Sequence, residues 1–114
     1  MANKKESKAR SIINEILEKV KAGRDDKKVS DNLWIDESVY GRDNQAAVGL
    51  PGIYDDDEGR ELIIEPNAEG TNISLVRYVN GDLHGGVNVK TVDEAFNQIA
   101  YFAIHGVLKN ENYY

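Results

Sequence analysis

The chain has 114 residues, two histidines, no cysteine and a net charge of −6 at pH 7. A length near about 100 to 150 residues is typical of one compact domain. The absence of cysteine excludes disulfides and thiolate metal sites and suits the reducing cytosol. The longest apolar stretch, Ile99 to Ile104, is too short to span a membrane, and the charged N-terminal residues do not form the hydrophobic region of a signal peptide. We therefore expect a soluble, cytoplasmic, single-domain protein.

The charge is divided unevenly along the chain. Residues 1–28 carry a net charge of +4, whereas residues 29–114 carry −10. This asymmetry predicts a basic arm attached to an acidic body. The body should repel nucleic acid, because phosphate binding depends on Lys and Arg. We therefore expect a basic partner and no direct contact with nucleic acid.

Residues 1–23 are predicted to contain a basic amphipathic helix. Its apolar residues recur at helical spacing, namely Ala9, Ile12, Ile13, Ile16, Leu17 and Val20. Asn3 and Glu6 can form a capping box, and Gly23 can supply a left-handed stop. Residues 24–28 are polar and are interpreted as a linker. The apolar stripe should pack on the sheet, or against the same stripe of a second copy in a homodimer.

Residues 29–90 are predicted to hold strands and loops. Segments 33–35 and 39–40 favour a short strand region, and residues 41–59 favour turns and loop. Residues 61–65 read as a strand that ends at Pro66.

The strongest local signal is Asn80-Gly81, which is typical of a type I′ turn joining segments 72–79 and 82–89 in a hairpin. The simple two-residue register pairs Tyr78 with Leu83, Arg77 with His84, Val76 with Gly85, and Ser74 with Val87.

Residues 91–108 are predicted to form the second amphipathic helix. Thr91 and Glu94 can cap its start and Gly106 can end it. Its apolar stripe comprises Val92, Phe96, Ile99, Ala100, Ala103 and Val107. We expect this stripe to cover the hairpin face that carries Val76, Tyr78, Leu83 and Val87, and residues 110–114 to form a tail. The predicted fold is α+β, a short antiparallel sheet with an N-terminal and a C-terminal amphipathic helix.

The leading functional hypothesis is a non-enzymatic inhibitor that covers a basic surface of another protein. Residues 31–65 carry a net charge of −8 and could imitate a row of phosphates. A nuclease or another nucleic-acid-binding protein would fit as the partner, as it does for immunity proteins and phage-encoded inhibitors. The predicted partner-binding residues are Asp36, Glu37, Asp55, Asp56, Asp57 and Glu58. The competing interpretation is an acidic surface that serves solubility only.

The alternative hypothesis is a small-ligand or nucleotide-binding module. Its predicted ligand-binding residues are Arg77, His84, Gly85, Gly86 and Asn88. A guanidinium, an imidazole and two residues without side chains could hold an anion close to the backbone. The same glycines also fit a bulge that bends the strand and leaves His84 facing solvent.

An uncharacterised enzyme is the third hypothesis. The sequence has no phosphate-binding glycine motif and no Gly-x-Ser-x-Gly nucleophile motif. The acids at positions 55–58 lack the glycine and glutamate spacing of a calcium-binding loop, so no metal or cofactor is expected.

Overall fold

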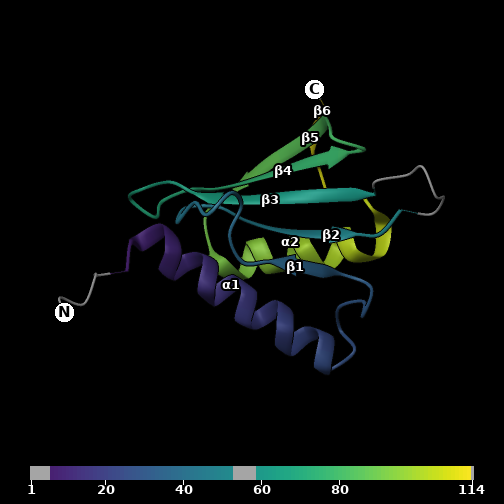
Figure 1. Cartoon of the computed structure of the whole chain (residues 1–114), viewed down its shortest axis with the longest axis horizontal. Helices are drawn as coiled ribbons and strands as arrows, with labels where there is room; N and C mark the ends of the chain where they lie inside the picture. Colours follow the sequence, from purple (N-terminus) through teal and green to yellow (C-terminus); the bar gives the residue numbers. More distant parts are fainter. Residues whose placement is uncertain (1–5, 53–58, 114) are drawn as a thin grey trace.

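The computed structural model describes residues 6–52 and 59–113, which form two helices and one six-stranded antiparallel sheet. The predicted α+β fold is confirmed. The strands lie across the sheet in chain order, so each one pairs with its sequence neighbour (Figure 1). No helix among these residues is long and apolar enough to cross a membrane. The elements are α1 (Lys8–Asp25), β1 (Trp34–Asp36), β2 (Ala46–Leu50), β3 (Arg60–Pro66), β4 (Ile73–Val79), β5 (Asp82–Val89), α2 (Val92–His105) and β6 (Asn112–Tyr113).

Alternation along the central strands determines which face of the sheet is covered. On β3 and β4, every second residue is buried, and Leu62, Ile64, Ile73 and Leu75 are at most 1% exposed. Their side chains share one core with the buried residues of α1 and α2. The opposite side of the sheet has no covering helix in the described part of the chain, and we call it the open face.

Helix α1 is confirmed, with different ends. Ser7 is the cap, where its hydroxyl accepts a hydrogen bond from the Arg10 N–H, and Asn3 of the predicted capping box lies outside the described residues. Gly23 is not the stop: it lies inside the helix, and Lys27 takes the left-handed conformation with φ 62°. A Cβ atom on Gly23 would lie 2.8 Å from Val29 Cγ2, so glycine is needed there for close packing. The predicted linker therefore begins inside the helix.

The apolar stripe of α1 is buried against the rest of its own chain. Its four central members, Ile13, Ile16, Leu17 and Val20, are each 3% exposed or less. Packing within the chain was one of the two alternatives for this stripe. A homodimer through the same stripe would have to expose these residues first.

Strand β2 was not predicted, because residues 41–59 were interpreted as turns and loop. Four of its five residues are buried, and β1 and β3 pair with it on either side. Its sequence therefore lacks the period-two alternation that identifies a strand with one exposed face. Val39 and Tyr40, predicted as strand, lie in a loop instead. Trp34 of β1 pairs with Gly49 of β2, and its indole ring lies over this glycine. An added Cβ atom at position 49 would overlap the ring, so the packing requires glycine there.

The hairpin of β4 and β5 is confirmed with its turn at Asn80 and Gly81, where φ is 51° and 83°. The predicted pairing of Tyr78 with Leu83 is also confirmed.

The pairing beyond Leu83 was wrong by one residue. Arg77 faces Gly85, Val76 faces Gly86 and Ser74 faces Asn88, because a bulge leaves His84 as the extra residue of β5. The bulge interpretation of this segment is therefore the one that holds.

The second helix begins at its predicted cap, where Thr91 Oγ accepts a hydrogen bond from the Glu94 N–H at 3.1 Å, and Gly106 ends it with φ 74°. Its fully buried ring is Phe102, whereas the predicted Phe96 is only partly buried. The face that it covers carries Leu75 and its partner Val87, so Val87 was placed correctly, whereas the predicted Val76, Tyr78 and Leu83 belong to the opposite face. The bulge at His84 separates Val87 from Leu83, because an extra residue moves the following residues of β5 to the other face.

The C-terminal residues are also different from the predicted tail. Asn112 and Tyr113 pair with Gly86 and Gly85 as β6, at the edge of the sheet.

Candidate functional site

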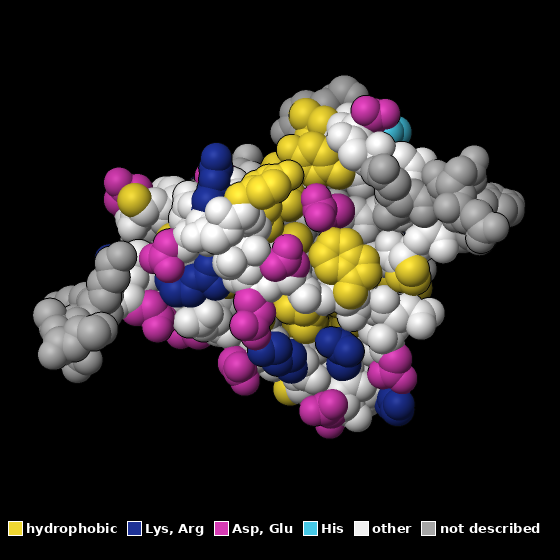
Figure 2. Space-filling model, in the orientation of Figure 1, with side chains coloured by type: hydrophobic (Ala, Val, Ile, Leu, Met, Phe, Trp, Pro, Cys, Tyr) yellow, Lys and Arg dark blue, Asp and Glu magenta, His cyan; other side chains and the backbone are white. Residues whose placement is uncertain are grey.

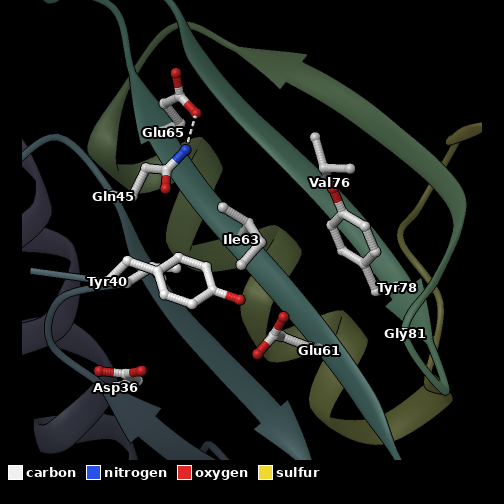
Figure 3. A pocket seen from close by; sticks show the side chains of 10 residues that line it. Asp36, Tyr40, Gln45, Glu61, Ile63, Glu65, Val76, Tyr78 and Gly81 are labelled. Carbon is white, nitrogen blue, oxygen red and sulfur yellow. Dashed lines mark hydrogen bonds between the residues drawn. The ribbon is translucent and has the colours of Figure 1, made fainter. Parts of the chain in front are cut away.

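A groove of about 560 Å³ lies on the open face (Figure 3). This volume lies within the usual range for ligand sites. Strands β1, β3 and β4 form its floor, and the segment 37–45, which we call the rim loop, forms one side. Its lining residues are Asp36, Val39, Tyr40, Gln45, Glu61, Ile63, Glu65, Val76, Tyr78 and Gly81.

The alternation of side chains along each strand explains why these residues lie together on the open face. On β3, Leu62 and Ile64 enter the core, so Glu61, Ile63 and Glu65 must point to the open face. The antiparallel register then places Val76 beside Ile63 and Tyr78 beside Glu61. Two aliphatic side chains therefore separate acidic groups from one another along the floor.

Three carboxylates line the groove, and no Lys or Arg lies among the described lining residues. Partial burial raises the pKa of Glu61, and repulsion from Asp36 raises it further. Glu65 accepts a hydrogen bond from the Gln45 side-chain amide at 2.5 Å. Asp36 accepts one from the Ser38 N–H at 3.2 Å. Glu61 is thus the carboxylate whose charge is least well compensated.

Arg10 of α1 holds the rim loop in place. Its guanidinium donates hydrogen bonds to four carbonyl oxygens of the loop, at 2.7 Å from Glu37, 3.0 Å from Arg42, 2.8 Å from Asp43 and 3.3 Å from Gln45. The loop is therefore fixed to the helix through its backbone.

Tyr40 stands at the edge of the groove on this loop. Its φ is 52°, and the next residue, Gly41, is also left-handed with φ 69°. A bulky residue in this conformation costs on the order of 1 kcal/mol and is kept where the surrounding structure imposes it. The ring is 95% exposed, and its hydroxyl points across the floor toward Glu61 (Figure 3). The loop therefore presents an aromatic ring that packing does not explain.

Several basic side chains on the helix side of the molecule form ion pairs. Four ion pairs join the segment 8–27 to acidic residues, namely Arg10 with Asp43 at 3.6 Å, Lys19 with Asp93 at 3.2 Å, Lys21 with Glu37 at 2.7 Å and Lys27 with Asp31 at 3.1 Å. The described part of the predicted basic arm, residues 6–28, thus lies against the rest of the chain. In Figure 2 most Lys and Arg side chains lie along α1, and acidic and hydrophobic side chains mix over the sheet.

The groove acids have no such partners. Within the described residues, Asp36, Glu61 and Glu65 form no ion pair. Three acids that have no ion pair within the described residues therefore line the same groove.

The predicted partner-binding residues are divided by the structure. Asp36 lies in the groove, whereas Glu37 pairs with Lys21, whose hydrogen bond lowers the pKa of that carboxyl. Residues 55–58, namely Asp55, Asp56, Asp57 and Glu58, lie outside the described residues.

Sequence reasoning missed Glu61, Glu65, Tyr40 and Tyr78 as site residues. A usable signal existed for the two acids, because Glu61, Ile63 and Glu65 alternate with Leu62 and Ile64. Nothing local distinguishes Tyr40.

Arg77, the cation of the alternative ligand site, is paired within the chain. Its guanidinium makes a bidentate ion pair with Glu111, with Nε to Oε2 at 3.0 Å and Nη2 to Oε1 at 2.7 Å, and the two side chains are 6% and 1% exposed. Gly85 makes room for this carboxylate, since an added Cβ atom would lie 2.8 Å from Oε2.

The remaining residues of that alternative are placed differently. His84 is exposed in the bulge, Gly86 pairs with β6, and the exposed Asn88 accepts a hydrogen bond from Asn72 at 3.1 Å. The anion that meets Arg77 is therefore a side chain of the same protein.

The two histidines lie outside the groove. His105 contacts the Tyr101 ring, with a centroid separation of 4.2 Å, at the end of α2. Among residues 6–52 and 59–113, no three His, Asp or Glu side chains are grouped so that they could hold a metal ion.

Comparisons of the chain with protein-family models, curated proteins and solved structures gave no match. The functional argument therefore starts from the groove.

Proposed function

We propose that this is a non-catalytic binding protein that docks a basic surface of a partner protein on its open face and occludes it. The observation that carries the proposal is the separation of charge. Basic residues of α1 form ion pairs with acids of other segments, whereas Asp36, Glu61 and Glu65 line one groove and form no ion pair within the described residues. The groove thus presents three carboxylates to which a cationic surface could bind.

Solubility alone explains acidic residues but not this arrangement. A solubilising surface needs charge spread over the molecule. Here the carboxylates surround an aliphatic floor, and a rigidly held loop adds the exposed ring of Tyr40. Aromatic groups beside apolar area are typical of the energetic centres of interfaces.

The partner chemistry follows from the sign of the groove. Carboxylates steer a basic protein toward the open face and compete with phosphate groups for its Lys and Arg side chains. The proposed role is therefore inhibition of a nuclease or another nucleic-acid-binding protein in the cytoplasm, in the manner of an immunity protein or a phage-encoded inhibitor.

The test uses two variants of the full chain with equal changes of charge. The groove variant combines Asp36→Asn, Glu61→Gln and Glu65→Gln, and the control combines Glu15→Gln, Asp25→Asn and Glu69→Gln at exposed positions outside the groove. Each is immobilised, and proteins of the native host are captured at low salt. Wild type and control should retain a basic protein that salt or added DNA releases, and the groove variant should lose it.

The association rate should also fall steeply with ionic strength, because the Debye length is about 8 Å at 0.15 M salt. Retention of the same protein by the groove variant at wild-type level would contradict docking at the open face. Retention that DNA leaves unchanged would contradict occlusion of a nucleic-acid-binding surface.

A further inference from the structure

We infer that the groove receives an arginine side chain of the partner, which lies along the aliphatic floor with its guanidinium against the Tyr40 ring and the Asp36 and Glu61 carboxylates. This inference rests on the proposed function and specifies the group that is recognised. It depends on three features of the groove: its floor, its acidic end and its aromatic side.

The floor suits the stem of a long basic side chain. Ile63 and Val76 are neighbours across β3 and β4, and both are partly exposed on the open face. Long basic side chains bury their methylene groups on such surfaces while the charged end stays near water. The stem would therefore cover apolar area that no described helix covers.

The acidic end suits the charged group. Glu61 and Asp36 both line the groove, and repulsion from Asp36 contributes to the raised pKa of Glu61. A cation in the groove would relieve this repulsion, and a guanidinium can donate to a carboxylate through its fixed set of N–H groups. An ammonium group would also be attracted, but as a point charge with a stronger hydration shell.

The aromatic side favours arginine over lysine. The Tyr40 ring is almost wholly exposed, so its faces are free to stack, and the Tyr78 ring lies on the other side of Ile63 (Figure 3). A planar guanidinium stacks on an aromatic face, and such contacts at exposed sites are worth a factor of about two to five in affinity. The ring therefore adds selectivity to an attraction that both basic residues share.

The rim loop is prepared for this contact before binding. Four hydrogen bonds from Arg10 fix the backbone on both sides of Tyr40. A positioned loop loses little conformational entropy when a ligand arrives. Because that guanidinium is already committed to carbonyl oxygens, it does not compete for the groove acids.

The experiment compares two blocked pentapeptides, Gly-Gly-Arg-Gly-Gly and Gly-Gly-Lys-Gly-Gly, by NMR titration of the full chain at low salt. The arginine peptide should bind about two to five times more tightly. Tyr40→Asn removes the ring and keeps a residue that tolerates positive φ. In this variant the ratio of the two affinities should fall to about one.

Charge variants separate the contributions of ring and carboxylate. Glu61→Gln should weaken both peptides together, and Glu69→Gln, an exposed change outside the groove, should leave both unchanged. Shifted amide signals should map to β3, β4 and the rim loop.

Each result decides between the inference and the proposed function. Equal binding of the two peptides by wild type, with loss of both in Glu61→Gln, would overturn arginine selectivity and leave the docking proposal standing. Signals that map away from the groove would overturn the inference, while the capture experiment judges the docking proposal separately. A preference for arginine that survives in Tyr40→Asn would overturn the assigned role of the ring.

Discussion

The two faces of the sheet are built from the same strands but differ in burial: one face forms the core with the helices, and the other is exposed. Toward the helices, β3 and β4 present Leu62, Ile64, Ile73 and Leu75, which are essentially unexposed. On the open face, the alternate residues of the same strands include two acids and a tyrosine that solvent reaches. The difference is a consequence of the two-residue period of a strand, which allows one segment to serve a core and a surface independently.

This comparison indicates where stability and recognition reside. Substitutions on the helix side should lower the free energy of unfolding, whereas exposed positions on the open face should change binding with little effect on folding. A protein organised in this way can vary its groove without losing its core.

Phe102→Ala should produce the largest loss on the helix side, because this ring is 0% exposed in the shared core. We expect a cost of about 3 to 5 kcal/mol from lost burial and the cavity left behind. The measurement is chemical denaturation at unchanged slope, with Tyr40→Asn as the open-face counterpart, for which we expect a change below about 0.5 kcal/mol. Similar costs for the two variants would break the distinction between the faces.

Glu111→Gln tests a polar contact buried on the helix side. The variant leaves the Arg77 guanidinium buried without its carboxylate, so a loss of about 1 to 3 kcal/mol is expected. Arg77→Leu combined with Glu111→Leu should recover part of that loss, because no unpaired charge then remains in the interior. A double variant that is less stable than Glu111→Gln would show that the pair itself, and not the unpaired charge, determines the result.

The sequence predicted what depends on local chemistry. The Asn80-Gly81 turn, the Thr91 cap and the Gly106 stop each depend on residues within one turn of chain, and all three are present. The stripe of α1 was readable for the same reason, since its period repeats over several turns.

Features that depend on contacts between distant segments were not readable. Strand β2 becomes recognisable only through its neighbours. The burial of Phe102 in place of Phe96 depends on how α2 packs against α1 and the sheet. The bulge at His84 changed the register by one residue and so moved the residues of β5 beyond it to the opposite face from the one predicted by simple alternation.

The candidate site was only partly predictable for the same reason. Asp36 was among the acidic candidates and lines the groove, but the other acids of the groove come from β3. The role of Arg10 is a contact across more than 25 residues of chain, with a loop whose backbone conformation no local pattern specifies.

Glu61→Gln should give the smallest change in stability and the clearest test of the electrostatics of the open face. Burial and the nearby Asp36 raise the pKa of Glu61 above its ordinary value of 4.5, so the folded protein takes up this proton at a higher pH than the unfolded chain does. Ionised Glu61 therefore opposes folding, and wild type should gain stability from this group as pH falls through the raised pKa toward 4.5.

The Glu61→Gln variant should be slightly more stable than wild type at pH 7, and this difference in stability should shrink to nothing below about pH 4.5. Denaturation midpoints measured between about pH 4 and pH 8, with Glu69→Gln as the control, will show whether the stability difference between variant and wild type disappears at low pH. An advantage that grows on acidification would mean that Glu61 is stabilised as an anion in the folded protein, and the groove would then already satisfy the charge that we propose it offers to a partner.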